Sequence, residues 1–340
     1  MKQQTSFPAL PAIKPLSLAE QLSQQWLQQV QPFWQNMQSG ELISQDGTRL
    51  FYQYHHTENA ICAVVISAGR MEMALKYAEL SYELVQAGYS VFILDHRGQG
   101  LSQRGLANRF KGDVVNFGLY QQDFSQFMQQ IVQPCQHRYH LALGHSMGCA
   151  ILAGYLQQQP KSPFSAAIFA APMFGIYTSF IPNSIAQNAV LALQKFNQYL
   201  SKTPWYAPGQ SDYCEKPFNN NLLTSSQPRY HWLQQRFQQQ TDSQLGGVTT
   251  RWLQQAIYAM QDIHQQAPSW QTPVLLLQAA SDKVVANKAQ NNWYQALPSG
   301  LYRNKVVIAA ARHEIFMEND QIRDQAFAAI NQFLQHLPLD

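Results

Sequence analysis

Short apolar runs that alternate with helical patterns constrain the fold of this 340-residue chain more than any other feature. The runs hold five to seven residues each and consist mainly of Val, Ile, Leu, Phe and Ala. They cover residues 61–67, 91–95, 139–143, 166–171, 273–279 and 305–310. Strands that are buried on both faces of a sheet have this composition. Helical patterns separate most of the runs, at residues 74–87, 119–131, 147–159, 249–265, 287–297 and 320–336. Regular alternation of this kind predicts a mostly parallel, doubly wound sheet in an α/β fold.

Two stretches depart from the alternation. Residues 41–56 place Asp46 and Gly47 between two extended runs, which predicts an N-terminal antiparallel hairpin. Residues 176–246 are rich in aromatic residues and proline and contain no convincing buried strand. We therefore expect a core at 39–175 and 247–340, interrupted by an inserted helical cap at 176–246.

The first 38 residues form a separate N-terminal segment in this interpretation. Residues 17–38 have the spacing of an amphipathic helix, with Ser17 and Glu20 in the positions of a capping box. Pro32 is expected to kink or divide the helix. Because its polar face is almost all glutamine, the pattern favours docking on the protein's own core over binding to anionic lipid.

Composition excludes several classes of function. The net charge of +3 is too dispersed for a nucleic-acid partner. We find no signal peptide pattern and no apolar run long enough for a membrane span, so we expect a cytoplasmic protein. The four cysteines have no CxxC pair and no histidine at ligand spacing, which argues against a zinc site and disulfides and favours buried free thiols. They are Cys62, Cys135, Cys149 and Cys214. Neither a metal nor another cofactor is expected.

The sequence GHSMG follows one of the predicted strands and precedes a predicted helix. Strand, Gly-x-Ser-x-Gly and helix, in that order, are typical of a nucleophile elbow, in which the serine occupies a sharp turn. Gly144 and Gly148 would be small because neighbouring backbone passes close by. We therefore expect Ser146 to be a nucleophile; the alternative is a tight turn without chemistry.

A serine nucleophile needs a general base and an acid that orients the base. Asp282 follows the run at 273–279, and His313 follows the run at 305–310. The order Ser, Asp, His and the position after strands match hydrolases with doubly wound sheets. Taken singly, Asp282 could cap the helix that starts near Asn287, and His313 could be a surface histidine. His145 precedes the serine, but its side chain should point away from the serine oxygen.

The oxyanion of a tetrahedral intermediate needs two N–H donors that are already in place. We expect one from the backbone of Met147, the residue after the nucleophile. The other should come from the loop SAGRME after the first parallel strand, and Arg70 is the candidate.

These motifs resemble the α/β-hydrolase family of monoacylglycerol lipases and bacterial lysophospholipases. The resemblance spans roughly residues 30–336 and rests on SAGRMEMALKYAELSYELVQAGYSVFILDHRGQGLSQR, GHSMGCA, APMFGI, TPVLLLQA and the HEI after the last strand. It implies an α/β-hydrolase fold, a triad of Ser146, Asp282 and His313, and attachment to the periphery of the bacterial inner membrane. Asp95, Gly98 and Gly100 in DHRGQGLS are read as residues that build a turn. Related lipases usually carry His-Gly-x-Gly where this chain has Ala68, Gly69, Arg70 and Met71, so the second glycine is lost.

The resemblance implies a serine esterase that hydrolyses lysophospholipids or monoacylglycerols through an acyl-enzyme. Aromatic rings of the cap could line an acyl-chain groove or pack the cap on the sheet. They are Phe180, Phe196, Tyr199, Trp205, Tyr206, Phe218, Tyr230, Trp232 and Phe237. The side chain of Arg70, or the basic loop at 103–112 with Arg104, Arg109 and Lys111, could pair with a substrate phosphate; the alternative is a solvated loop. Rival interpretations are an aminopeptidase-like enzyme, another small-ester hydrolase, or a binding module without catalysis.

Overall fold

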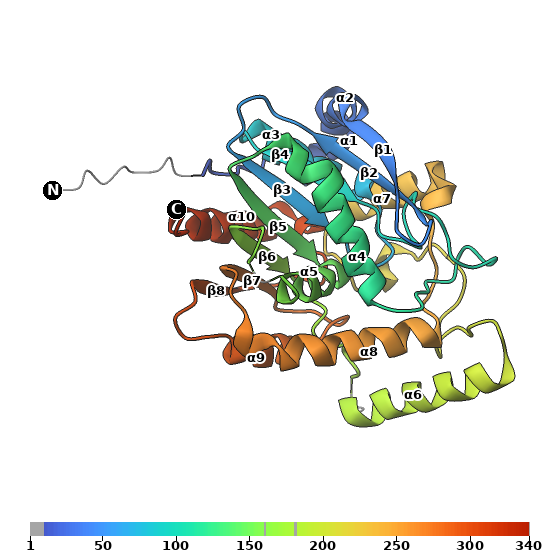
Figure 1. Ribbon diagram of the computed structural model, residues 1–340. Helices are drawn as coiled ribbons and strands as arrows, with labels where there is room; N and C mark the ends of the chain where they lie inside the picture. The colour runs from blue at the N-terminus through green and yellow to red at the C-terminus, as the bar shows by residue number, and fades with distance from the viewer. Residues whose placement is uncertain (1–9, 160, 180–181, 340) are drawn as a thin grey trace.

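The computed structural model describes residues 10–159, 161–179 and 182–339, and it confirms a mostly parallel sheet. Eight strands lie in the order β1-β2-β4-β3-β5-β6-β7-β8 (Figure 1). They are β1 Gln38–Ile43, β2 Arg49–His55, β3 Cys62–Ser67, β4 Ser90–Leu94, β5 Tyr139–His145, β6 Ala166–Ala170, β7 Val274–Ala279 and β8 Arg303–Ile308. Only the pairs β1–β2 and β2–β4 are antiparallel, so the carboxyl ends of β3 to β8 meet along one edge.

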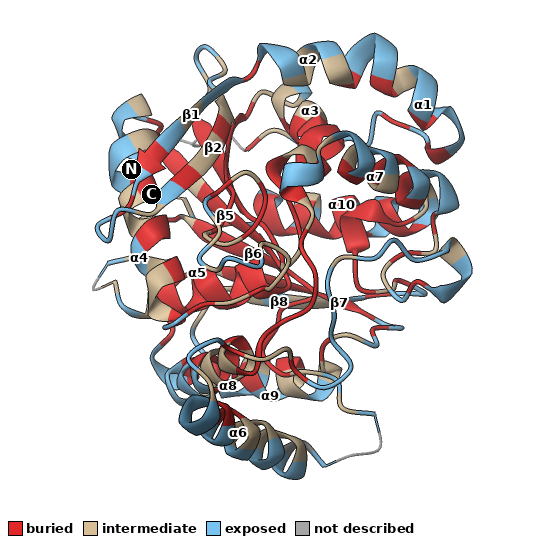
Figure 2. Ribbon diagram, turned by 90° about the vertical axis from the view of Figure 1, so that its right-hand side faces the viewer, coloured by how far each residue is buried: buried red, intermediate tan, exposed pale blue. Residues whose placement is uncertain are grey.

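Helices cover both faces of this sheet, as the alternation predicts. On one face lie α3 Ala78–Gln86 and α10 Asp320–Gln335 (Figure 1). On the other lie α4 Gly118–Phe127, α5 Met147–Gln157, α8 Thr250–Gln265 and α9 Asn287–Ala296. The strands between these layers are almost wholly buried (Figure 2), which explains why their sequences are apolar at successive positions.

The last strand differs from its prediction. The apolar run at 305–310 suggested a strand buried on both faces, but β8 begins at Arg303 and lies at the edge of the sheet. Five of its six residues are partly buried or exposed, with Val307 50% exposed, and Ile308 is the buried one. An edge strand has one neighbour, so fewer of its side chains are covered.

The hairpin formed by β1 and β2 confirms the turn predicted at Asp46 and Gly47. The N–H of Ser44 donates to the carbonyl of Thr48 at 2.9 Å. Gly47 has a φ of +85°, a conformation that glycine adopts without steric cost. The hairpin therefore extends the parallel sheet by two antiparallel strands.

Residues 176–246 contribute no strand to the sheet in the part that the structure describes. They include α6 Asn183–Leu200, which packs on α8, and α7 Gln227–Gln239, which lies at the other end of the molecule from α6 (Figure 1). Isolated bridges join the segment to the core between Ile176 and Val285, near its start, and between Tyr206 and Thr249, after α6.

Buried ion pairs fix α7 to the core. Arg229 pairs with Glu79 of α3 at 2.8 Å and with Asp320 of α10 at 2.8 Å. Arg323 of α10 pairs with Glu79 at 2.8 Å and with Glu83 at 2.7 Å. The two guanidinium groups and two glutamates therefore join α3, α7 and α10, and we refer to these four residues with Asp320 as the Glu79 group.

The N-terminal helix begins later than expected and lacks its capping box. Instead of capping, the hydroxyl of Ser17 donates to Glu79 at 2.5 Å and to Glu83 at 3.2 Å. A 3₁₀ turn Ala19–Gln21 leads into α1 Leu22–Gln25, a π-helical turn Trp26–Val30 and α2 Gln31–Asn36. The irregular turn directly precedes α2, which has Pro32 in its first turn; proline has no N–H for a regular helical bond.

The apolar side of the N-terminal helix faces the protein. Leu22, Trp26 and Val30 lie in one buried cluster with Trp232 and Leu233 of α7. The rings of Trp26 and Trp232 meet edge to face, with centroids 5.0 Å apart. This surface is therefore covered by α7 and is not available to a bilayer.

The cysteines are free, but they are not all buried. Cys62 and Cys149 are buried, Cys135 is partly exposed and Cys214 is exposed. Cys214 lies in the segment between α6 and α7, outside the sheet, so the prediction of buried thiols is wrong for it and for Cys135. Among the described helices, none combines the length and apolar character that crossing a membrane requires.

Candidate active site

Ser146 lies in a strained turn between β5 and α5. Its backbone has φ +50° and ψ −114°, which few residues with a side chain adopt. The N–H of Ser146 donates to the carbonyl of Ala170 at 3.0 Å. A Cβ atom at Gly148 would lie 1.9 Å from the carbonyl oxygen of Ser67, so the loop after β3 passes directly against the start of α5. This close approach requires glycine.

The structure brings the three predicted residues together at the carboxyl edge of the sheet. Nε2 of His313 lies 2.9 Å from Oγ of Ser146. Nδ1 of the same ring lies 2.8 Å from Oδ2 of Asp282. All three residues are buried. The hydrogen bonds form a continuous chain from carboxylate to imidazole to hydroxyl, which is the arrangement that activates a serine.

Asp282 uses its two oxygens differently. Oδ1 accepts the backbone N–H groups of Val284 at 2.8 Å and Val285 at 3.0 Å, and Oδ2 faces His313. Burial raises the pKa of this carboxyl, but the hydrogen bond and charge of His313 with the two N–H donors leave the pKa below its ordinary value. Asp282 does not cap α9, because the N-cap residue of that helix is Ala286.

His145 points away from the serine oxygen toward a buried carboxylate. Its Nδ1 lies 2.7 Å from Glu72, and its Nε2 lies 3.1 Å from the backbone carbonyl of His313. Burial lowers the pKa of His145, but Glu72 outweighs burial and raises the pKa above its ordinary value. His145 therefore contacts the backbone of His313 and holds no hydrogen bond to Ser146.

Glu72 is a residue that the sequence analysis missed. It accepts hydrogen bonds from the N–H of Gly69, from the hydroxyl of Tyr77 at 2.6 Å and from Lys76 at 2.7 Å. Burial raises the pKa of Glu72, but Lys76 and His145 together hold it well below its ordinary value. Because its partners include a residue 73 positions away, no local pattern could have identified it.

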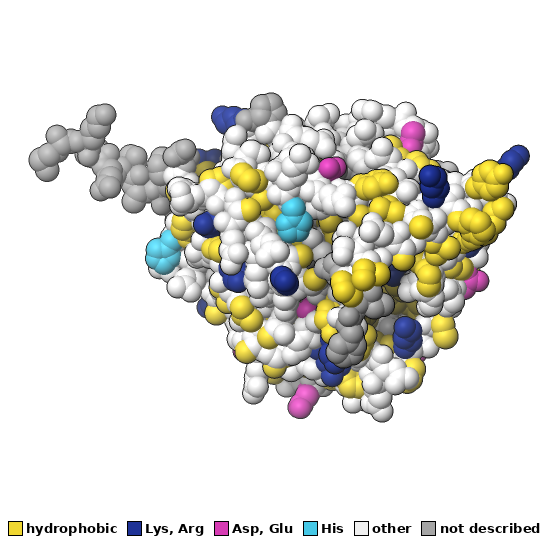
Figure 3. All heavy atoms as spheres, turned by 90° about the horizontal axis from the view of Figure 1, so that it is seen from below, with side chains coloured by type: hydrophobic (Ala, Val, Ile, Leu, Met, Phe, Trp, Pro, Cys, Tyr) yellow, Lys and Arg dark blue, Asp and Glu magenta, His cyan; other side chains and the backbone are white. Residues whose placement is uncertain are grey.

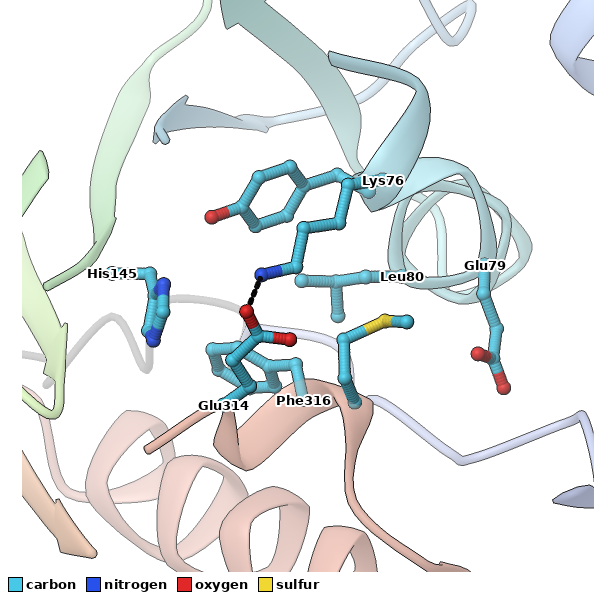
Figure 4. A pocket seen from close by; sticks show the side chains of 8 residues that line it. Lys76, Glu79, Leu80, His145, Glu314 and Phe316 are labelled. Carbon is cyan, nitrogen blue, oxygen red and sulfur yellow. Dashed lines mark ion pairs between the residues drawn. The ribbon is translucent and has the colours of Figure 1, made fainter. Parts of the chain in front are cut away.

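A small cavity is lined by Lys76, Tyr77 and His145, the three side chains that bind Glu72. Lys76 also pairs with Glu314 at 2.9 Å, and Figure 4 shows this pair beside His145, Leu80 and Phe316. The cavity measures about 10 Å³, enough for roughly one water molecule. The loop after β3 and the loop after β8 are thus joined through buried charges.

The two predicted oxyanion donors lie in the loop after β3 and at the start of α5. Met147 is the first residue of α5, where backbone N–H groups have no partner within the helix. The N–H of Arg70 donates to no acceptor in the described part of the chain. Met71 has a φ of +63° at the position where related lipases carry glycine, so the loop keeps a glycine-like backbone despite the substitution. Their role as donors remains a prediction.

The DHRGQGLS stretch builds a turn. The carboxylate of Asp95 accepts the N–H of Ala74 at 2.6 Å and that of Leu101 at 2.8 Å. Gly98 and Gly100 both have positive φ, and a Cβ atom at Gly100 would lie 2.1 Å from Asp95. Burial raises the pKa of Asp95 to about 7.

The aromatic rings of residues 176–246 differ in burial, and Trp205, Tyr206 and Phe218 are partly buried. Tyr230, Trp232 and Phe237 are buried on α7; Trp232 and Phe237 pack in the cluster of the N-terminal helix, and the Tyr230 ring meets Phe218. Phe196 and Tyr199 of α6 are exposed. Phe180 lies outside the described residues.

A second cavity of about 90 Å³ lies between α6 and α8 and is almost entirely apolar. It is lined by Ile176, Thr178, Ala186, Gln187, Val190, Leu253, Ile257 and Met260.

Comparison with known proteins adds three findings. The family model described as serine aminopeptidase, S33 matches residues 58–320. Lysophospholipase L2 of Escherichia coli strain K12 is 33% identical over 305 residues, which cover 88% of each chain. Monoglyceride lipase of Rattus norvegicus is 24% identical over 296 residues, 87% of this chain and 89% of the relative.

Solved structures share the fold. A soluble variant of monoglyceride lipase from Saccharomyces cerevisiae, in complex with a substrate analog, superposes with a TM-score of 0.67 at 19% identity, covering 89% of this chain and 96% of that one. A thermostable carboxyl esterase from Bacillus coagulans in complex with glycerol gives 0.68 at 19% identity, covering 88% and 98%. These matches confirm the α/β-hydrolase fold.

Proposed function

The chain belongs to the serine aminopeptidase S33 family of α/β hydrolases, in its lysophospholipase and monoacylglycerol lipase branch, and we propose that it removes the single acyl chain of lysophospholipids or monoacylglycerols. It is a carboxylic ester hydrolase. The observation that carries the proposal is the hydrogen-bonded chain of Asp282, His313 and Ser146 at the turn after β5.

In the proposed reaction, Nε2 of His313 accepts the proton of Ser146 as the serine oxygen attacks the ester carbonyl. The backbone N–H groups of Arg70 and Met147 stabilise the negative charge on the carbonyl oxygen. His313 then donates the proton to the departing alcohol, which leaves an acyl-enzyme on Ser146. Water, deprotonated by the same imidazole, releases the fatty acid, and Asp282 stabilises the charged imidazole throughout.

Residues 176–246 act as a cap in this proposal, between core segments 39–175 and 247–340. The apolar cavity between α6 and α8 provides a place for part of an acyl chain.

The helix α6 also carries apolar side chains that face solvent, with Ile185 60% and Tyr199 88% exposed. Figure 3 shows hydrophobic groups spread between polar ones on the side seen from below. We assign this helix, and not residues 1–38, as the element that contacts the cytoplasmic surface of the inner membrane.

The test of the reaction compares three substrate classes. Wild type and Ser146→Ala would be assayed for product release from oleoyl lysophosphatidylethanolamine, monoolein and an aminoacyl naphthylamide. We expect release of oleic acid by the wild type and at least about a thousandfold lower rate in the variant. Cleavage of the naphthylamide alone would instead support an aminopeptidase. A folded wild type that a fluorophosphonate probe does not label would support a binding module.

The membrane assignment has its own test. Flotation with liposomes of anionic and zwitterionic lipid should recover the wild type, and Ile185→Gln combined with Tyr199→Gln should reduce the bound fraction. Deletion of residues 1–38 that abolishes flotation while the protein remains folded would contradict the assignment to α6.

A further inference from the structure

Arg70 holds a positive charge beside the proposed oxyanion site without a carboxylate partner. Its guanidinium donates to the carbonyl of Gly246 at 2.9 Å and contacts the sulfur of Met71 at 2.8 Å. The group also lies over the ring of Trp252, with Cζ 5.9 Å from the centroid. No Asp or Glu oxygen of the described chain lies within 4.0 Å of it. Every contact is therefore with a neutral group, and the charge is not compensated.

Two fully buried arginines of this protein are paired with carboxylates, whereas Arg104, like Arg70, is partly buried and donates to backbone carbonyls. Arg229 and Arg323 are almost fully buried, and each pairs with two carboxylates. Removing an arginine from water without such a partner is costly, because the charge loses its hydration. Burial lowers the pKa of Arg70 to about 10, so the guanidinium is still charged at neutral pH. A retained, uncompensated cation at this position suggests an anionic ligand.

The surroundings of Arg70 fix the direction of its side chain. The backbone of residue 71 adopts a positive φ, an unfavourable conformation for methionine, and places the Met71 sulfur against the guanidinium. The carbonyl of Gly246, which lies between α7 and α8, and the ring of Trp252 on α8 also contact the guanidinium. Two guanidinium nitrogens of Arg70, Nη1 and Nη2, make the contacts with Gly246 and Met71, and the residue as a whole is partly buried.

We infer that the side chain of Arg70 binds the head-group phosphate of a lysophospholipid while its backbone N–H faces the ester carbonyl. This inference rests on the proposed function. In a lysophospholipid the phosphorus is separated from the ester by the short glycerol backbone, and in Arg70 the guanidinium is separated from the peptide N–H by a chain of similar length. One residue can therefore contact both ends of the same substrate. Guanidinium groups bind phosphate through paired, charge-assisted hydrogen bonds.

The basic loop at 103–112 is the alternative phosphate site, and its cations have other partners. Arg109 pairs with Asp242 at 3.0 Å, and Arg104 donates to the carbonyl of Asp242 at 2.8 Å. Lys111 donates to the carbonyl of Pro204 at 2.8 Å. These side chains bind residues 204–244, and none of them belongs to the loop that follows β3.

Three variants test the inference: Arg70→Met, Arg70→Lys and the matched control Arg109→Met. The measured quantity is the preference of each variant for a charged over a neutral lipid. The ratio of kcat/KM for oleoyl lysophosphatidylethanolamine to that for monoolein would be measured in the same mixed micelles. Methionine keeps the backbone N–H and much of the side-chain length, so the ratio reports the charge. We expect it to fall at least about tenfold in Arg70→Met, to recover partly in Arg70→Lys and to stay within about twofold in Arg109→Met. An unchanged ratio in Arg70→Met, or an equal fall in Arg109→Met, would overturn the inference.

A second measurement separates this inference from the proposed function. Glycerol phosphate would be tested as a competitive inhibitor of p-nitrophenyl butyrate hydrolysis, with glycerol as the neutral control. We expect its inhibition constant to rise at least about fivefold in Arg70→Met. Wild type that hydrolyses neither lipid would disprove the proposed function, yet the inhibition by glycerol phosphate would still decide whether Arg70 binds phosphate. Equal inhibition of wild type and Arg70→Met would exclude the phosphate site even if both lipids were hydrolysed.

Discussion

Two buried polar clusters differ in where their interactions end: the Glu79 group joins the helices α3, α7 and α10, and the other cluster lies at the carboxyl edge of the sheet. In the Glu79 group, each guanidinium is bound by two carboxylates, and Ser17 adds a hydroxyl from the N-terminal segment. In the chain Asp282–His313–Ser146, the hydrogen bonds end on a serine hydroxyl that is held by a strained backbone. The guanidinium groups of one cluster each have carboxylate partners within the protein, and the other cluster ends at a reactive group.

This difference predicts which substitutions reduce stability and which reduce activity. Buried charges that are fully paired hold elements together, and removing one member leaves another charge without compensation. A chain that ends on a hydroxyl contributes less to folding but positions a proton acceptor. We therefore expect substitutions in the first cluster to lower the free energy of unfolding, and substitutions in the second to lower kcat.

The largest effect is expected from Asp282→Asn. The asparagine oxygen can still accept the N–H groups of Val284 and Val285, so the loop should keep its shape. The amide N–H₂ would face Nδ1 of His313, which favours the wrong tautomer for accepting the serine proton. We expect kcat to fall by about a thousandfold or more, as measured with p-nitrophenyl butyrate, with little change in the urea midpoint. A fall of less than tenfold in folded protein would argue against Asp282 as the orienting acid.

Arg229→Met should lower stability and leave kcat nearly unchanged. Glu79 would keep only Arg323 as its charged partner, and Asp320 would lose its pair with α7. We expect the free energy of unfolding to fall by about 3–5 kcal/mol in urea titrations, with kcat close to wild type at low temperature. The matched control is Arg109→Met, an exposed pair with Asp242, which should change stability by less than about 1 kcal/mol. Equal losses in both variants would contradict the contrast.

We expect low pH to destabilise the Glu79 group, and substitutions can separate the contribution of Glu79 from that of Glu83. Burial raises the pKa of Glu79, but Arg323 and Arg229 outweigh it and lower the pKa below the ordinary 4.5. The unfolded chain therefore binds this proton first, so the stability from Glu79 is present above pH 4.5 and is lost as the pH falls through the lowered pKa.

Glu83 titrates in the opposite direction, because burial raises its pKa despite Arg323. Its contribution is greatest at low pH and is lost as the pH rises through that raised pKa. Urea midpoints measured from pH 6 downward should therefore fall less steeply in Glu79→Gln than in wild type, and more steeply in Glu83→Gln. The reverse ranking would show that the charges of this cluster are paired differently.

The smallest effect is expected on the outer face of α6. Tyr199 is 88% exposed, so Tyr199→Ser should change the free energy of unfolding by less than about 0.5 kcal/mol. Thermal denaturation of the two proteins checks this. A loss comparable to that of Arg229→Met would mean that Tyr199 is covered in solution.

Local patterns predicted the parts of this molecule that depend on local physics. The buried strands follow from their apolar runs, and Ser146, Asp282 and His313 follow from their positions after strands. Ser17 shows where such patterns fail: its spacing from Glu20 suits a cap, but two glutamates more than 60 residues away take its hydroxyl. Glu72 and Arg229 could not be identified for the same reason, because their partners are distant in sequence.

The start of the cap shares its backbone pairing with the loop that carries Asp282. Tyr177 donates to the carbonyl of Val284 at 3.0 Å, and Ala286 donates to that of Gly175 at 2.9 Å. The N–H groups of Val284 and Val285, in turn, bind Asp282. Chimeras that exchange caps between relatives should therefore transfer residues 282–286 together with the cap. A junction at residue 176 alone would pair the first residues of one cap with the Asp282 loop of another protein.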